Sequence, residues 1–322
     1  MHGVLDAEEE EWKLETACRI GEVMAEQGRY NEAASWHRRV MEQRLGQSPL
    51  NVEKAAAAAV QCLRCHQQQE STFTVVDNTI INDLDRIWKE RPQNNESYDI
   101  PTCGHELGVR LLALGRDEEA VALLLPVWER RKLFGEALGQ ESLASALSLV
   151  DLSVKTGNLS RLETLYHWII TNPTAGQSET DQLWFRYRLG CVQAILEKWA
   201  IAENNLRKVL DRQTELFGAE DADSLQYTQV LAEVIKRQGR LADAKTLVRN
   251  IWESRSRHPR SVLQAILRIG HLYGDIIMES NAPAELAKAE TVSNFCCRLF
   301  LPLAMSREQF FVRALETCSR CS

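Results

Sequence analysis

The amino-acid sequence predicts an all-α solenoid, built from helical hairpins that stack one after another. Glycine (16) and proline (8) are scarce among the 322 residues, below average usages of about 7% and about 5%, which disfavours turn-rich sheets. A six-residue phrase also recurs along the chain, with a period of about 42 residues. The apolar residues around each copy follow a helical period, so the recurring unit is a pair of helices.

The recurring phrase opens with a turn residue and closes five residues later with a small or apolar one. Its first residues, which we call the turn anchors, are Gly28, Gly115, Gly157, Glu197 and Gly239. The steps from 115 to 157 and from 197 to 239 are both 42 residues, whereas the step from 28 to 115 is about twice as long. A degenerate repeat is therefore expected near residue 70. Glycine at an anchor supplies the left-handed backbone that ends the first helix of a hairpin.

A second series of residues lies seven positions before the turn anchors. Its members are Gly21, Gly108, Val150, Gly190 and Ala232, and Gly274 continues it. Small residues at these positions let a neighbouring helix approach closely. Since one hairpin cannot bury its apolar faces alone, about seven units must stack to account for the length of the chain.

Two segments depart from the period. Over about residues 66–101 we expect a degenerate repeat with a long loop, a divergent second helix at about 77–89 and another loop from Pro92 to Pro101. Near the end, Ser306 opens a capping-box pattern and an apolar stripe with Phe310 and Phe311 follows it, which predicts a capping helix. The expected organisation is one solenoid over residues 1–305, followed by a capping helix and tail over 306–322.

With these residues aligned, the chain resembles the tetratricopeptide repeat (TPR) proteins, specifically the 42-residue repeats of kinesin light chains. The clearest unit opens with Leu216-Phe217-Gly218 and continues to the turn anchor Gly239. The resemblance implies a right-handed α-solenoid of about seven TPR-like hairpins with a C-terminal capping helix. It also implies a protein-interaction scaffold or adaptor rather than an enzyme.

The resemblance further implies that the first helix of each hairpin, helix A, lines a concave groove. The groove positions lie 2, 3, 6, 10 and 13 residues before each turn anchor, and they give an apolar, aromatic middle and a charged C-terminal end. Such a groove suits a protein or peptide segment, for example an amphipathic helix. The candidate partner-binding residues are His105, Val109, Leu112, Leu147, Asp151, Trp184, Tyr187, Gln229, Glu233, Arg268, His271 and Asp275.

Trp184 and Tyr187 lie three residues apart on one helical face, and they are the expected aromatic anchors of the groove. The alternative is that the apolar groove residues, such as Trp184, Val109 and Leu147, only pack against adjacent helices.

Two other classes of function stay open. An enzyme or small-molecule-binding protein could use the same apolar groove as a pocket, with His105, Asp151, Tyr187 or the pair His271 and Asp275 as its polar groups. No catalytic residue is assigned, because nothing beyond a shared helical face brings these groups together. Self-association through the solenoid ends and the capping helix is the third class.

Charge and hydropathy limit the partners. Lys plus Arg total 38 and Asp plus Glu 45, so the net charge is −7, which disfavours a nucleic-acid partner. The longest apolar runs are far shorter than the roughly 18 residues that a membrane helix needs. The first twelve residues are acidic and lack the features of a secretory signal. We therefore expect no nucleic-acid or membrane partner, and a cytoplasmic or nuclear location.

Nine cysteines, an odd number, are typical of reduced thiols rather than of a disulfide framework. Cys62, Cys65 and His66 fit the C-x-x-C-H pattern of haem attachment, and Cys318 and Cys321 form a second C-x-x-C pair that could complete a zinc site. Because Cys62 and Cys65 also lie on the apolar face of a predicted helix, buried thiols are the favoured interpretation. We expect neither a cofactor nor a metal.

Arg130, Arg131 and Lys132 form a short basic cluster. We interpret it as a solvated helix end, with a site for an acidic partner as the alternative.

Overall fold

The computed structural model describes residues 2–68, 78–92, 97–135, 139–253, 263–280 and 292. In these residues there are thirteen α-helices and no strand. The helices are α1 (His2–Glu26), α2 (Tyr30–Leu45), α3 (Val52–Gln67), α4 (Asn78–Lys89), α5 (Asp99–Ala113), α6 (Asp117–Lys132), α7 (Gly139–Lys155), α8 (Leu159–Thr171), α9 (Glu179–Ile195), α10 (Trp199–Phe217), α11 (Ala222–Arg237), α12 (Leu241–Glu253) and α13 (Leu263–Glu279). The predicted all-α class is confirmed.

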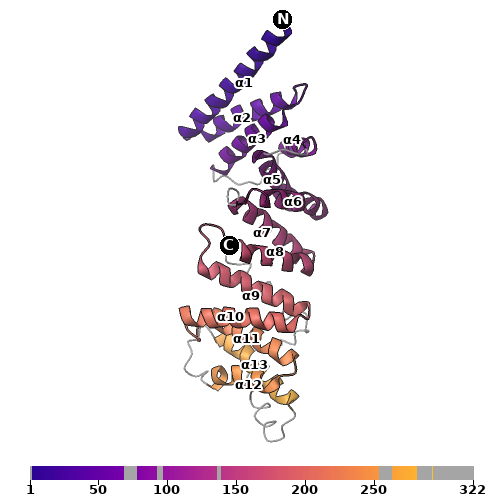
Figure 1. Ribbon diagram of the computed structural model, residues 1–322. Helices are drawn as coiled ribbons and strands as arrows, with labels where there is room; N and C mark the ends of the chain where they lie inside the picture. The colour runs from indigo at the N-terminus through magenta and orange to yellow at the C-terminus, as the bar shows by residue number, and fades with distance from the viewer. Residues whose placement is uncertain are drawn as a thin grey trace. The chain divides into compact units, whose positions relative to one another are not determined.

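The chain divides into two compact units, unit 1 over residues 1–152 and unit 2 over residues 153–322, and α7 crosses the division. Within each unit, helices that follow one another in the chain pack together, as α1 does with α2, α5 with α6, α9 with α10 and α11 with α12 (Figure 1). The predicted solenoid of stacked hairpins is confirmed at this level. Helices α1 to α12 correspond to six consecutive pairs, and α13 corresponds to helix A of a seventh. This agrees with the expected seven units. The expected capping helix over 306–322 and the boundary at 305 lie outside the described residues.

The turn anchors adopt the backbone that the sequence predicts. The φ angles are 75° at Gly28, 72° at Gly115, 67° at Gly157 and 79° at Gly239. Glu197 has a φ of 58°, and among the described residues it is the one non-glycine residue with a positive φ. An L-residue in this conformation is strained by roughly 1 kcal/mol.

The glycines of helix A permit close helix packing, as predicted. A Cβ atom added at Gly21, Gly108 or Gly190 would lie within 2.7, 2.5 or 2.8 Å of a side chain on the second helix of the same hairpin. That side chain belongs to His37, Leu124 or Leu206, each sixteen residues further along the chain. Since real Cβ atoms do not approach so closely, a larger residue at these positions would push the two helices apart.

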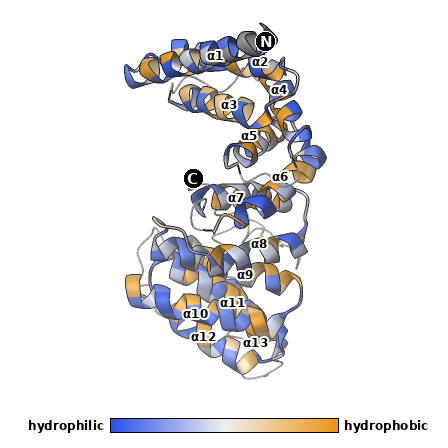
Figure 2. Cartoon of the chain, turned by 45° about the horizontal axis from the view of Figure 1, so that its top comes forward, coloured by the Kyte–Doolittle hydropathy of each residue, from blue (hydrophilic) through white to orange (hydrophobic). Residues whose placement is uncertain are grey.

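The last residues of the recurring phrase form part of the core. Ala33, Ala120, Leu162, Ala202 and Ala244 are all 1% exposed or less. Hydrophobic and hydrophilic residues occur on the same helices, as Figure 2 shows for α9 to α13. Most helices thus bury one side and keep polar residues for the outside, whereas α9 and α11 are buried on every side over residues 187–194 and 227–235.

The degenerate region around residues 66–101 contains the expected divergent helix, α4, at Asn78–Lys89. The expected loop up to Pro101 was too long, because α5 already begins at Asp99. Pro101 is the third residue of α5, where the missing N–H costs little because the first N–H groups of a helix have no partner within it.

Candidate binding surface

The structure distributes the predicted groove residues over two faces, one in each unit. The unit 2 face comprises Trp184 and Tyr187 on α9, Gln229 and Glu233 on α11, and Arg268, His271 and Asp275 on α13. The unit 1 face comprises His105, Val109 and Leu112 on α5, and Leu147 and Asp151 on α7. In unit 2 the helices that carry these residues are neighbours, because α11 packs against both α9 and α13.

Tyr187 is a core residue and not the exposed anchor that the sequence suggested. Its side chain is 0% exposed. Its ring lies against that of Tyr227, with the centroids 4.4 Å apart. Its hydroxyl oxygen accepts a hydrogen bond from Gln226 Nε2 at 3.1 Å. The spacing of three residues predicted that Tyr187 shares a face with Trp184, but the Tyr187 side chain lies in the contact between α9 and α11 and is buried there.

Trp184 is half-buried and stays in part open to solvent. Its ring meets Phe185 edge-on at 5.0 Å. The guanidinium of Arg188 lies 4.6 Å from the ring centroid, a cation–π contact. These contacts hold the indole in place while leaving part of it accessible, which keeps Trp184 available as an anchor.

The α11 and α13 part of the unit 2 face is charged and largely paired. Glu233 is 7% exposed, and its Oε1 forms an ion pair with Arg237 Nη2 at 2.6 Å. Lys236 Nζ lies 2.8 Å from Glu279, and this ion pair joins α11 to α13. Glu233 is therefore buried and not the exposed groove residue that the sequence suggested. The charges that a partner segment can reach are those of α13, where the side chains of Glu279, His271 and Asp275 are at least a third exposed.

His271 and Asp275 form the ion pair that their spacing suggested. Nδ1 and Oδ2 are 3.2 Å apart, and both side chains are at least a third exposed. The hydrogen bond to Asp275 raises the pKa of His271, while burial and Lys236 oppose the rise. Of the other residues on this face, Gln229 is buried and Arg268 is half-buried.

On the unit 1 face, His105 is half-buried, and its Nδ1 lies 3.3 Å from the hydroxyl oxygen of Ser145. Burial, and secondly the charge of Arg131, lower the pKa of His105 to about 3. Ser145 is 0% exposed, so no substrate can reach this serine–histidine contact. The pair therefore packs helices and does not form a nucleophilic centre. Val109 and Asp151 are exposed on this face, and Leu112 and Leu147 are half-buried.

Arg131 is buried, at 1% exposure, and so is not the solvated residue expected for the basic cluster. Its Nη1 donates to the carbonyl oxygen of Glu141 and to the hydroxyl of Ser145, both at 2.6 Å. Its Nη2 donates to the hydroxyl of Thr102 at 3.4 Å. These bonds join α6 to α5 and α7. The tertiary packing of α7 over the end of α6 covers a side chain that local sequence alone placed in water.

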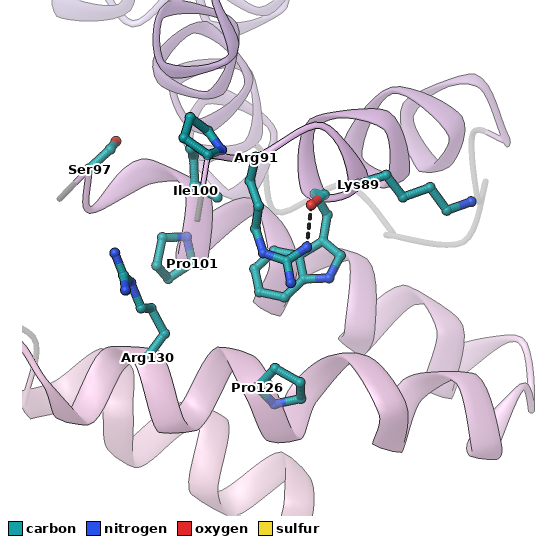
Figure 3. Close-up of a pocket in the computed structure, with 9 residues that line it drawn as sticks. Lys89, Arg91, Ser97, Ile100, Pro101, Pro126 and Arg130 are labelled. Carbon is teal, nitrogen blue, oxygen red and sulfur yellow. Dashed lines mark hydrogen bonds between the residues drawn. The ribbon is translucent and has the colours of Figure 1, made fainter. Parts of the chain in front are cut away.

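A cavity of about 410 Å³, lined by none of the predicted groove residues, lies between the end of α4, the start of α5 and α6 (Figure 3). It is lined by Trp88, Lys89, Arg91, Pro92, Ser97, Ile100, Pro101, Pro126 and Arg130. Sequence reasoning missed it because its residues come from the degenerate region and from a helix end. The available signals were a tryptophan and an arginine three residues apart, followed by proline.

The cysteines of the C-x-x-C-H pattern are buried, as expected for structural thiols. Cys62 and Cys65 are 1% and 4% exposed. Burial raises the pKa of Cys62 to about 12, and its thiol donates to the carbonyl oxygen of Ala34 at 3.5 Å. Among the residues that the structure describes, no three His, Cys, Asp or Glu side chains are grouped as metal ligands. Cys318 and Cys321 lie outside them.

The described helices include none that is long and apolar enough to span a membrane.

Comparison with known proteins agrees with the fold. The tetratricopeptide repeat family model matches residues 102–137, which cover most of α5 and α6. No curated protein matches the chain. The family-model match thus identifies α5 and α6 as one tetratricopeptide-type hairpin.

Two solved structures of TPR-like repeats, described as those of a Podospora anserina kinesin light chain, are similar in fold. The first, a variant, has a TM-score of 0.50 and 18% identity, and the match covers 62% of this chain and 93% of that one. The second has a TM-score of 0.48 and 17% identity, covering 69% and 97%. The resemblance to repeats of the kinesin light-chain type is confirmed at the level of fold.

Proposed function

We propose that the chain is a protein-interaction scaffold that binds a segment of a partner protein on the unit 2 face. Trp184 is the apolar anchor of this site, and the exposed charged side chains of α13 orient the segment. The partner segment is an amphipathic helix or an extended peptide, with an apolar residue for the indole and polar residues for the charged region. The proposed site of action is the cytoplasm or the nucleus.

The partly open Trp184 carries this proposal. Tryptophan is enriched among residues that dominate interface energetics, provided that it is reachable and held in place. Both conditions are met, since Phe185 and Arg188 fix the ring and part of it faces solvent. The TPR-type fold supports a scaffold in general, because repeat arrays present extended surfaces to partners.

A photo-crosslinking experiment tests the site directly. The photoreactive amino acid p-benzoylphenylalanine replaces Trp184 in one variant and Ile201 in a control. Ile201 lies on α10, is 52% exposed and is not part of the unit 2 face. We expect position 184 to crosslink to one defined segment of a partner protein, identified by mass spectrometry, and position 201 to give no such product. Equal crosslinking from both positions would contradict the proposal, and a product joining two copies of the chain would replace it with self-association.

The partner identified in this way allows an affinity measurement. Trp184→Ala should weaken binding of the crosslinked segment by about tenfold or more, as expected for a central aromatic anchor. Ile201→Ala should change the affinity less than twofold. Thermal melting of both variants checks that they fold. Tyr187→Ala is not a suitable probe, since Tyr187 belongs to the core and its loss would act through stability. Unchanged affinity in folded Trp184→Ala would rule out the indole as the anchor.

A further inference from the structure

The cavity between α4, α5 and α6 has a one-sided charge. Three of its lining residues, Lys89, Arg91 and Arg130, are basic, and none is acidic. This is unusual in a chain whose net charge is −7. A concave site lined by one sign of charge attracts small ligands of the opposite sign.

The guanidinium of Arg91 is held in position by Trp88. It lies 3.8 Å from the centroid of the indole ring, and its Nη1 donates to the main-chain oxygen of Trp88 (Figure 3). This single bond leaves most of the N–H groups of Arg91 without a partner in the described residues. Burial, and secondly the nearby charge of Arg130, lower the pKa of Arg91. The two arginines therefore face a common space in which their charges repel.

Arg130 approaches the cavity from α6 and is half-buried. In the part of the chain that the structure describes, its guanidinium has neither a hydrogen bond nor an ion pair. Lys89 differs, because its Nζ donates to Asp85 Oδ2 at 2.6 Å. The available positive charge thus belongs to Arg91 and Arg130.

The remaining walls of the cavity are mostly apolar and stiff. The edge of Trp88, buried Ile100 and the rings of Pro101 and Pro126 form them. The prolines carry no backbone N–H and little side-chain freedom, so such walls lose little entropy when a ligand binds. The volume, about 410 Å³, falls in the range of small-ligand sites, roughly 300–1,000 Å³.

We propose that this cavity binds a small organic anion, with its phosphate or carboxylate between Arg91 and Arg130 and its apolar part against Trp88 and Pro101. Two planar guanidinium groups match the oxygens of these anions, since each can donate two parallel hydrogen bonds. A bound anion would also relieve the repulsion between the two arginines. The site shares no residue with the unit 2 face, and the proposal does not depend on the proposed scaffold function.

Fluorine NMR of the full chain labelled with 5-fluorotryptophan tests the proposal, with phenyl phosphate as the probe. The Trp88 signal is assigned by its loss in Trp88→Phe. We expect phenyl phosphate to shift this signal in a saturable manner, and the neutral analogue benzyl alcohol to bind at least tenfold more weakly. Raising the salt concentration should weaken binding of the anion. A Trp88 signal that does not move with phenyl phosphate would overturn the proposal.

Matched charge variants separate the site from a general effect of charge. Arg91→Gln and Arg130→Gln should each weaken binding about tenfold, as expected when a charge-assisted contact is removed. Arg86→Gln makes the same change in net charge on α4, but Arg86 is paired with Glu90 and does not line the cavity. It should change affinity less than twofold. Equal losses in all three variants would contradict a specific site.

Thermal stability provides a second readout. Because Arg91 and Arg130 repel each other, Arg130→Gln should melt at the same temperature as the wild type or above it, while it loses affinity for phenyl phosphate. A lower melting temperature together with unchanged affinity would show that Arg130 serves only the fold, and would overturn its part in the site.

Binding of a phosphopeptide in the same assay distinguishes a small-molecule anion from a phosphorylated protein segment. The peptide is Gly-Gly-phosphoserine-Gly-Gly with an acetylated N-terminus and an amidated C-terminus. It carries a phosphate monoester like that of phenyl phosphate, but no aromatic ring. We expect it to bind at least tenfold more weakly than phenyl phosphate, because it lacks the group that contacts the apolar walls. Tighter binding of the peptide would overturn the small-molecule source and assign the cavity to a phosphorylated partner.

Discussion

The two units bury a charged side chain in opposite ways. In unit 1, Arg131 is 1% exposed, and in unit 2, Glu203 is 9% exposed. Among the described residues no carboxylate pairs with Arg131, and its donors meet only neutral oxygens of Thr102, Glu141 and Ser145. Burial accordingly lowers the pKa of Arg131 to about 10. Unit 1 thus joins three helices through a buried charge whose hydrogen bonds go only to neutral groups.

Glu203 of unit 2 is surrounded by donors instead. Nε of Arg207 donates to it at 2.9 Å within α10, and the turn between α11 and α12 supplies Gln238 at 2.8 Å and Arg240 at 2.9 Å. Burial by itself would raise the pKa of Glu203, but the hydrogen bonds from Arg207, Gln238 and Arg240 outweigh it, and the pKa is lowered. This carboxylate favours its charged form and links one repeat to the next.

The difference shows that the same hairpin geometry accepts a buried charge by two routes. A long guanidinium can reach main-chain and hydroxyl oxygens on several helices, whereas a short carboxylate needs cations brought to it. The variants below test each route.

The largest effect is expected for Arg131. Arg131→Ala should lower the free energy of unfolding by about 3 kcal/mol, because it empties a buried site and removes the three hydrogen bonds to oxygens of α5 and α7. Arg131→Met should cost less, about 1–2 kcal/mol, since it fills the site and leaves no charge unpaired. Urea denaturation followed by circular dichroism measures both. Equal losses would show that the hydrogen bonds and not the volume decide stability.

An intermediate effect is expected for Glu203→Gln, about 1–2 kcal/mol at pH 7. Because the folded pKa of Glu203 is lower than the usual value of 4.5, the wild type gains stability above that value and loses it as the pH falls through the folded pKa. The difference between wild type and variant should therefore shrink between pH 7 and pH 4.

Glu215→Gln is the matched control for this measurement. Glu215 lies on the same helix, is 65% exposed and pairs only with Arg212 among the described residues. Its loss should stay within about 0.5 kcal/mol at any pH. A difference for Glu203→Gln that did not depend on pH would refute the link between its charge and its neighbours.

The smallest effect is expected at Glu197 in unit 2, where a substitution should increase stability. Glu197→Gly should raise the free energy of unfolding by about 0.5–1 kcal/mol, because glycine adopts the left-handed backbone without strain. The reciprocal change at the next turn anchor, Gly239→Glu, should cost a similar amount. Both changes are measured by urea denaturation. A loss of stability in Glu197→Gly would mean that the Glu197 side chain holds the turn through contacts.

The periodic part of the fold could be predicted because each repeat imposes the same two requirements. A turn anchor needs a left-handed backbone, and a helix-A position needs a small side chain opposite residues such as Leu124 and Leu206. Both requirements appear as residue types at fixed spacing. The spacing therefore identified Glu197 as a turn anchor although it is not a glycine.

The side-chain environments could not be predicted in the same way. Spacing placed Tyr187 and Trp184 on one face, but it does not show that Tyr227 of α11 packs against Tyr187 and helps to bury it. The burial of Arg131 likewise depends on α7. The cavity with Arg91 and Arg130 brings together residues of the degenerate region and of α6, and no repeat period relates them.

The glycines of the repeats are constrained for two separate reasons, which bear on how the repeats can diverge. At Gly28, Gly115 and Gly239 a Cβ atom would meet nothing within 4 Å, so handedness alone opposes an ordinary side chain. Substitution there costs only the conformational free energy of placing an L-residue in the left-handed region, a cost small enough for single mutations to persist. A D-amino acid would not have this cost. At Gly108 the obstacle is a neighbouring side chain, and change there requires a compensating second mutation. Turns can therefore diverge singly, whereas helix contacts must coevolve.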